Sequence, residues 1–189
     1  CGAHLKNTFC LTRGGEAFLS QHIGDLDEAD SQKFFLEAEE NFEKLLDVKP
    51  EIIIHDLHPD YGSTRLAQKI AHRRGLKLIG VQHHAAHIAS VMAEHGLREP
   101  VIGICLDGTG LGTDNTIWGG EFLIIDPDSR EGFRRAGHLK QTALPGGDAA
   151  ALETWRMALS WLKTVYGDNW RKNAGELFSN INAAALATA

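Results

Sequence analysis

LKLIGVQHHAAHIAS, residues 76–90, predicts a strand that leads directly into a helix carrying three histidines. His83 and His87 are four residues apart and share one helical face, and His84 is three residues from His87. Two neutral imidazoles on one turn can bind the same divalent metal if other groups complete its coordination. The same spacing also occurs on ordinary solvated helix faces, so the pair alone leaves both interpretations open.

Strands and helices alternate along the chain around this segment. A strand with three consecutive isoleucines is expected at 51–57, and a helix at 63–74 ends at Gly75, a residue suited to a helix C-cap. The strand at 76–81 and the histidine helix, expected to end at Gly96, come next. This order predicts an α/β fold with largely parallel central strands.

The first fifty residues are predicted to form a hairpin and a helix. Two glycines supply a tight turn between strands at 5–11 and 16–20, and a helix follows at 31–47. Within that helix, Phe35 is expected to face a core and Glu39 to face water.

After residue 100 the order of hairpin and helix recurs, without sequence identity between the two halves. The expected elements are a strand at 101–106, a glycine-rich turn at 107–112, strands at 116–125 and 134–142, and a helix at 147–166. Two such halves, 1–99 and 100–189, predict a duplicated, actin-like (ribonuclease-H-like) ATPase fold that is incomplete at its carboxyl end.

Composition argues against several classes of partner. The chain has 189 residues, enough for a sizeable core, and its net charge of −6 gives no reason to expect a nucleic-acid or anionic-membrane partner. No apolar stretch approaches the roughly 20 residues of a membrane span. Three scattered cysteines are too few for a disulfide framework, which suits a reducing cytoplasm.

One motif points to a phosphate-bearing ligand. Asp107-Gly108-Thr109-Gly110 follows an apolar strand, where a carboxylate can face a ligand while the glycine backbone approaches phosphate closely. A simple turn explains the same four residues equally well.

Paired glycines occur at two further places. Gly119-Gly120 interrupts a strong strand, and glycine in a strand interior often marks close approach by a ligand or by another backbone. Gly146-Gly147-Asp148 precedes a predicted helix, whose positive dipole end can hold a phosphate. Asp148 can equally serve as a helix N-cap.

Several polar residues near the predicted strands are candidates for the same site. His55 and His58 follow the isoleucine-rich strand at its carboxyl end, the edge where α/β sheets bind ligands, although His58 can also be a turn residue. With His84, they are possible outer-shell groups. Lys6 and Asn7 are candidate anion contacts, unless the lysine simply extends to the surface.

Six ordered motifs resemble those of the HypF family, the carbamoyltransferases of NiFe-hydrogenase maturation. The resemblance spans essentially the whole chain and corresponds to the carboxyl-terminal transferase domain, which is related to the threonylcarbamoyl transferases of tRNA modification. The motifs are GAHLKNTFCL (2–11), HDLHPDY (55–61), QHHAAH (82–87), DGTG (107–110), IWGGE (117–121) and LPGGD (144–148).

The resemblance implies that ATP-derived carbamoyl-adenylate, made in a neighbouring domain, is held near a divalent metal. Its carbamoyl group is then passed to the carboxyl-terminal cysteine of a HypE-like partner. Since the attacking thiol belongs to that partner, no catalytic nucleophile is expected in this chain. Iron, zinc and magnesium remain open as the metal. By resemblance, the metal pair is His83 and His87, the second phosphate-contacting turn holds Asp107, and a nucleotide-contacting loop holds Gly146, Gly147 and Asp148.

Two other functions remain open: a non-catalytic nucleotide- and metal-binding docking module, and a small-molecule O-carbamoyltransferase. Ala85 stands where many relatives have a further histidine, which leaves open the loss of an outer-shell contact. Since the family's other domains are missing from this sequence, we expect the chain to be inactive alone in the overall reaction.

Overall fold

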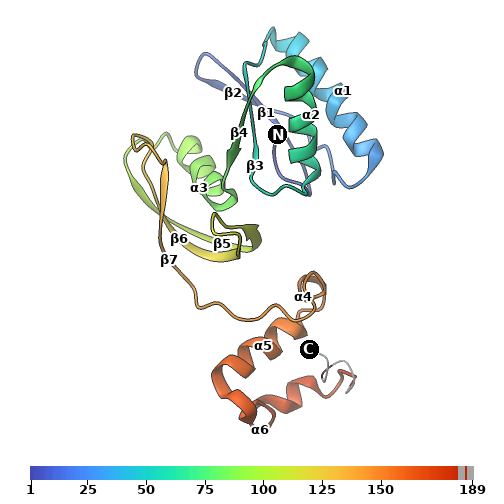
Figure 1. The fold of residues 1–189 in the computed structure, drawn as a ribbon, viewed down its shortest axis with the longest axis vertical. Coiled ribbons are helices and arrows are strands. Elements are labelled where there is room, and N and C mark those ends of the chain that lie inside the picture. The colour runs from blue at the N-terminus through green and yellow to red at the C-terminus, as the bar shows by residue number, and fades with distance from the viewer. Residues whose placement is uncertain (183–185, 187–189) are drawn as a thin grey trace. The chain divides into compact units, whose positions relative to one another are not determined.

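The computed structural model describes residues 1–182 and 186, and the chain gathers into two compact units, Cys1–Gly137 and His138–Ala189 (Figure 1). The predicted halves, which meet after residue 99, are the two copies of a duplicated fold and are not defined by compactness. That division stays a prediction. Among the described residues, none of the helices combines the length and apolar character needed to cross a bilayer.

The first unit begins with the predicted hairpin, although its first strand is shorter than expected. β1 (Cys10–Arg13) pairs antiparallel with β2 (Glu16–Leu19). The prediction that this strand starts at residue 5 is wrong, because the backbone bends at Lys6, which has a φ of 48°. Asn7 instead forms an isolated antiparallel bridge with Gly24.

The alternating α/β segment is confirmed. β3 and β4 are parallel neighbours, and α2 ends at Gly75, whose left-handed φ of 68° suits glycine. α1 and α2 pack with β1 and β3 around the first hydrophobic core. The elements of this segment are α1 (Ala29–Leu46), β3 (Ile52–Asp56), α2 (Gly62–Arg74), β4 (Lys77–Val81) and α3 (His83–Glu94).

Helix α1 buries the carboxylate of Glu39, which the helical pattern predicted to be exposed to solvent. Phe35 is fully buried, as predicted, but Glu39 is only 7% exposed. Arg74 donates a hydrogen bond of 3.0 Å to Glu39 and one of 2.8 Å to Glu43. The prediction for Glu39 is wrong because the last turn of α2 brings a guanidinium over this face of α1.

A three-stranded sheet of order β5-β6-β7 completes the first unit, from β5 (Val101–Leu111), β6 (Ile117–Ile125) and β7 (Phe133–His138). β5 and β6 are antiparallel. Helix α3 packs against β5 and β6 through a second core, and Figure 1 draws α3 beside the two strands. Its buried members are Ala85, Ile88, Met92, Cys105, Trp118, Leu123 and Ile125.

The predicted glycine-rich turn at 107–112 is wrong, because β5 continues through it to Leu111. Leu106 pairs with Gly120, and pairing resumes only where Gly110 pairs with Trp118. Residues 107–109 therefore bulge out opposite the single residue Gly119. A bulge bends a strand and redirects its side chains, and bulges are common next to active sites.

The second unit is helical, and the single helix predicted at 147–166 is interrupted. α4 (Ala149–Leu152) and α5 (Trp155–Tyr166) are separated at Glu153, whose φ of −103° and ψ of 78° are not helical. The remaining elements are η1 (Gly167–Asn169), α6 (Trp170–Ala174) and η2 (Gly175–Phe178), and the buried core residues are Leu159, Trp170 and Phe178.

Candidate functional site

The histidine pair lies at the start of α3, where a buried glutamine fixes the first turn. Gln82 is the N-cap, and its side-chain oxygen accepts a 2.9 Å hydrogen bond from the backbone N–H of Ala85. The helix therefore starts at His83, and His87 follows one turn later on the same face. Their Nε2 atoms are 3.2 Å apart. The prediction that the two histidines share one face of a helix is confirmed.

Asp107 completes a group of three potential ligands. Its Oδ2 atom lies 3.0 Å from His83 Nε2 and 3.8 Å from His87 Nε2, because the bulge in β5 directs this carboxylate toward α3. One ligand atom from each of the three residues lies within 4.8 Å of the others. Asp107 Oδ2 is buried and accepts no hydrogen bond from the residues that the structure describes. Two imidazoles and a carboxylate with a free oxygen fit a divalent cation such as zinc or iron.

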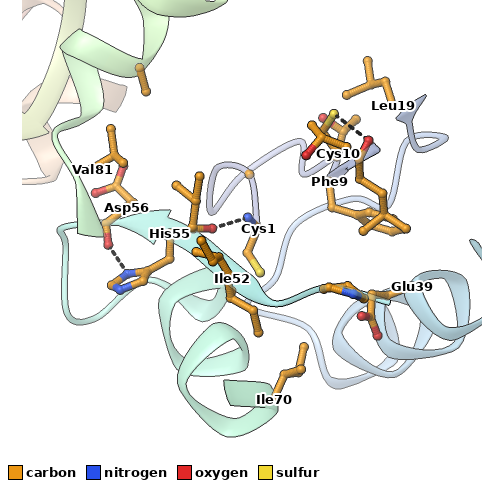
Figure 2. Close-up of a pocket in the computed structure, with 18 of the residues that line it drawn as sticks. Cys1, Phe9, Cys10, Leu19, Glu39, Ile52, His55, Asp56, Ile70 and Val81 are labelled. Carbon is orange, nitrogen blue, oxygen red and sulfur yellow. Dashed lines mark hydrogen bonds between the residues drawn. The ribbon is translucent and has the colours of Figure 1, made fainter. Parts of the chain in front are cut away.

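Sequence reasoning did not single out Asp56, the last residue of β3. Its Oδ2 accepts a 2.6 Å hydrogen bond from His83 Nδ1, and its Oδ1 accepts one of 2.8 Å from the backbone N–H of His58. Figure 2 shows Asp56 at the end of β3, with its partner in the sheet, Val81, beside it. The signal in the sequence was a carboxylate at the carboxyl end of a predicted strand.

Hydrogen bonding between Asp56 and His83 favours an ion-pair-like contact, against the effect of burial. Burial alone would raise the pKa of Asp56, but the hydrogen bonds from His83 and His58 outweigh it, so that this pKa is lower than usual. The pKa of His83 is raised, mainly by the hydrogen bond to Asp56 and against the effect of burial. The carboxylate thus stays ionised beside the imidazole.

His84 lies between α3 and β5 and is completely buried. Gln82 donates a side-chain hydrogen bond of 2.9 Å to His84 Nδ1 and one of 3.1 Å to the carbonyl of Leu111. Burial lowers the pKa of His84, and the neighbouring His83 acts in the same direction. Gln82 therefore ties His84 and the start of α3 to the end of β5, close behind the metal-ligand candidates.

The two other histidines proposed as outer-shell groups contact Asp56 rather than the histidine pair. The His55 ring nitrogen Nδ1 lies 2.6 Å from the carbonyl oxygen of Asp56. The His58 ring stacks on Tyr61, with the ring centroids 4.3 Å apart. Their relation to the candidate metal site is therefore indirect and runs through Asp56.

The glycines of β5 and β6 have close backbone contacts at the bulge. A Cβ atom on Gly119 would stand 3.1 Å from the carbonyl oxygen of Asp107, so the close neighbour of this glycine is another backbone. The side chain of Asp107 also accepts a 2.6 Å hydrogen bond from the N–H of Gly108. Gly108 and Thr109 are exposed at the bulge, and Gly120 is partly exposed.

The remaining candidates lie near the start of the first unit or in the second unit. Lys6 is exposed, while Asn7 is fully buried and donates side-chain hydrogen bonds to the carbonyls of Cys1 and Ala3. The amide of Asn7 therefore holds the first residues in place. In the second unit, Gly146 and Gly147 have positive φ values of 82° and 57°, and Asp148 makes no capping hydrogen bond through its side chain.

A pocket of about 920 Å³ runs along β3, and His83 and His87 are among its lining residues. Figure 2 draws part of its wall, including Ile52, Asp56 and Val81. Asp56, His83 and His87 contribute to one part of its wall, and apolar residues of β3 contribute another. The candidate metal site is therefore open to a cavity large enough for a small organic ligand. Further lining residues include Ile52, Ile54, Val81, Ala86 and Ser90.

Comparison with known proteins matches both parts of the chain to one family. The family model described as HypF Kae1-like domain matches residues 1–94, and the model described as carbamoyltransferase, Kae1-like domain, second subdomain, matches residues 103–188. Carbamoyltransferase HypF2 of Cupriavidus necator is 51% identical over 164 residues, which are 87% of this chain and 20% of that protein. Carbamoyltransferase HypF of a Synechocystis species is 42% identical over 182 residues, which are 96% of this chain and 23% of that protein.

Solved structures resemble the chain in the same way. The crystal structure of full-length HypF in the phosphate- and nucleotide-bound form matches with a TM-score of 0.85 and 44% identity, covering 98% of this chain and 23% of that one. The crystal structure of HypF from T. kodakarensis matches with a TM-score of 0.80 and 43% identity, covering 87% and 21%. The chain thus spans about a fifth of the length of these relatives.

Proposed function

Because this chain belongs to the HypF family, we propose that it forms part of a carbamoyltransferase domain that binds a divalent metal through His83, His87 and Asp107. The domain passes the carbamoyl group of carbamoyl-adenylate to the carboxyl-terminal cysteine of a HypE-like partner, in the synthesis of the cyanide ligands of NiFe hydrogenase. The observation that carries the proposal is the convergence of the ligand atoms of these three residues. The proposed fold is the duplicated actin-like one, with halves 1–99 and 100–189.

The residues at the site suit this transfer. His83 and His87, through Nε2, and Asp107, through Oδ2, would hold the metal. A divalent cation there would supply positive charge to stabilise the adenylate phosphate and to polarise the carbamoyl carbonyl. In the transfer, the thiol sulfur bonds to the carbamoyl carbon, the bond from that carbon to the phosphate oxygen breaks, and AMP and a proton are released. The chain provides binding and orientation, while the partner provides the nucleophile.

Nucleotide binding is a further part of the proposal. It is supported by a relative with 44% identity that was crystallised in a phosphate- and nucleotide-bound form. The exposed bulge next to the candidate metal site is a suitable place for phosphate oxygens, because its backbone is open to solvent. The residues proposed to contact the nucleotide are Lys6, Asn7, Asp107, Gly108, Thr109, Gly110, Gly119, Gly120, Gly146, Gly147 and Asp148.

The test is metal content, measured on the chain by elemental analysis, together with carbamoyl transfer by the full-length protein that carries it. The double variant His83→Ala, His87→Ala should lose both near-stoichiometric metal and transfer to the partner's cysteine. The matched control is His95→Ala, an exposed histidine just beyond α3. Normal metal content or normal transfer in the double variant would overturn the proposal.

The same full-length protein separates the two other functions. Binding of carbamoyl-adenylate without any turnover would indicate a docking module. Carbamoylation of small hydroxyl acceptors in preference to the cysteine would indicate an O-carbamoyltransferase.

A further inference from the structure

Asp56, at the end of β3, is fixed in place by hydrogen bonds to its side chain and to its backbone, and by burial. Both oxygens of its carboxylate accept hydrogen bonds, one from His83 Nδ1 and one from the backbone N–H of His58. Its carbonyl oxygen accepts a 3.1 Å hydrogen bond from the hydroxyl of Thr64. The side chain is almost fully buried, with 6% of its surface exposed. The carboxylate therefore has very little freedom to rotate toward another hydrogen-bond donor.

The contact with Asp56 determines which nitrogen of His83 can bind a metal. A carboxylate only accepts hydrogen bonds, so the nitrogen that faces it, Nδ1, carries the proton. In the neutral imidazole the lone pair is then on Nε2, the atom that lies 3.2 Å from His87 Nε2 and 3.0 Å from Asp107 Oδ2. The free lone pair is thus directed at the other two ligand candidates.

We propose that Asp56 is the positioning residue of the candidate metal site, because it fixes the tautomer and the orientation of His83. The inference rests on the metal site of the proposed function. Carboxylates in this outer position raise the basicity of a ligating histidine, and their loss usually weakens metal binding by about 10- to 100-fold.

The backbone couples the two residues as well. Asp56 ends β3 and pairs with Val81, the last residue of β4, and the N–H of Leu57 donates a 3.2 Å hydrogen bond to the Val81 carbonyl. His83 comes only two residues after Val81, so the parallel strand pair sets the distance between carboxylate and imidazole. A rigid element of this kind holds a ligand more precisely than a loop does.

His87 has no comparable support. Its side chain is 57% exposed, and its contacts are with His83 Nε2 and, at 3.8 Å, with Asp107. Its orientation can therefore adjust to a bound ion. The structure thus assigns one preoriented histidine, His83, and one adaptable histidine, His87, to the same site.

The experiment measures Co²⁺ binding to the chain by competition with a chelator, and compares the wild type with Asp56→Asn. Asparagine keeps the shape but removes the charge and one acceptor oxygen. We expect the Co²⁺ dissociation constant to rise by about 10-fold or more, with an altered visible absorption spectrum of the bound cobalt. The matched control is Asp60→Asn, an exposed carboxylate in the loop between β3 and α2 that pairs with Arg65. This variant should bind Co²⁺ like the wild type.

A second readout needs no metal. At pH 9, where imidazoles are neutral, ¹⁵N NMR of the histidine rings should find the His83 proton on Nδ1 in the wild type and shifted toward Nε2 in Asp56→Asn. A purely structural role of Asp56 would leave this distribution unchanged in a folded variant. Should Asp56→Asn fail to fold, Asp56→Glu retains the charge but displaces the acceptor oxygen. It should then weaken Co²⁺ binding by at least about threefold.

The outcomes separate the two proposals. If the wild type binds no Co²⁺, the metal site itself is overturned, and this inference with it. If the wild type binds Co²⁺ and Asp56→Asn binds it within twofold of the same affinity, the role of Asp56 is overturned while the metal site stands. Weaker binding with a changed tautomer supports both.

Discussion

Gly110 in β5 lies directly against the ring of His84: a Cβ atom on Gly110 would stand 2.6 Å from His84 Cε1 and 3.2 Å from His83 Cδ2. His84 is buried and hydrogen-bonded to Gln82, so it has little room to move away. The strand backbone can therefore approach the histidine turn this closely only because residue 110 has no side chain.

Gly110→Ala should displace the histidine turn. We expect a loss of about 1–3 kcal/mol in the free energy of unfolding, because overpacking forces the imidazoles or the strand to shift. Co²⁺ binding should weaken as well. Gly108→Ala is the matched control, since a Cβ atom there would meet no atom of the described residues within 4 Å. Urea unfolding and Co²⁺ titration of both variants test this, and equal behaviour of the two would contradict it.

Arg135 neutralises a buried carboxylate under the bulge. Glu121 is 2% exposed and accepts hydrogen bonds of 2.6 Å and 3.0 Å from Arg135. Arg135→Ala should therefore reduce the free energy of unfolding by about 3–5 kcal/mol, because it leaves an unpaired buried charge. Arg134→Ala, which changes the exposed neighbour in β7, should have little effect in the same urea titration. A similar small loss in both variants would contradict the prediction.

Glu39 should make stability depend on pH. Burial, supported by the neighbouring Glu43, raises the pKa of Glu39 from 4.5 to about 7, against the effect of Arg74. The folded state therefore binds this proton more tightly than the unfolded state. Its stabilising contribution is complete below about pH 4.5 and is lost as the pH rises to about 7.

Glu39→Gln should remove this dependence. The difference in the free energy of unfolding between variant and wild type should change by about 1–3 kcal/mol in favour of the variant when the pH rises from 4.5 to 7.5. Glu40→Gln, the same substitution at an exposed position in the same helix, is the matched control variant. Chemical unfolding at the two pH values tests this. A Glu39→Gln difference that is independent of pH would contradict the raised pKa.

Gln82 holds the start of α3 through three hydrogen bonds, which involve Ala85, His84 and Leu111. Gln82→Met has a similar volume but leaves these buried polar groups without that partner. We expect a loss of about 1–3 kcal/mol in the free energy of unfolding and weaker Co²⁺ binding. Gln68→Ala, on the exposed face of α2, provides the comparison. Retention of wild-type stability and affinity by Gln82→Met would contradict this role.

Much of the fold was predictable from local patterns. The parallel strands β3 and β4 and the helices between and after them lie close to the predicted ranges, since the periodicity of apolar residues reflects the face that each element buries. The same patterns failed at Glu39 and at residues 107–112. Glu39 is buried because Arg74 arrives from a separate helix, and residues 107–109 bulge because β6 resumes pairing at Gly110. Neither partner is visible in the local sequence.

The candidate site, too, was predictable from the local sequence only in part. The spacing of His83 and His87 by itself determined that both face one side of a helix, because the helical repeat is a property of the local backbone. Their meeting with Asp107 and Asp56 was decided only by the tertiary structure. Those contacts depend on the register of β3 against β4 and on a bulge in β5, which are set by pairing between segments far apart in the chain.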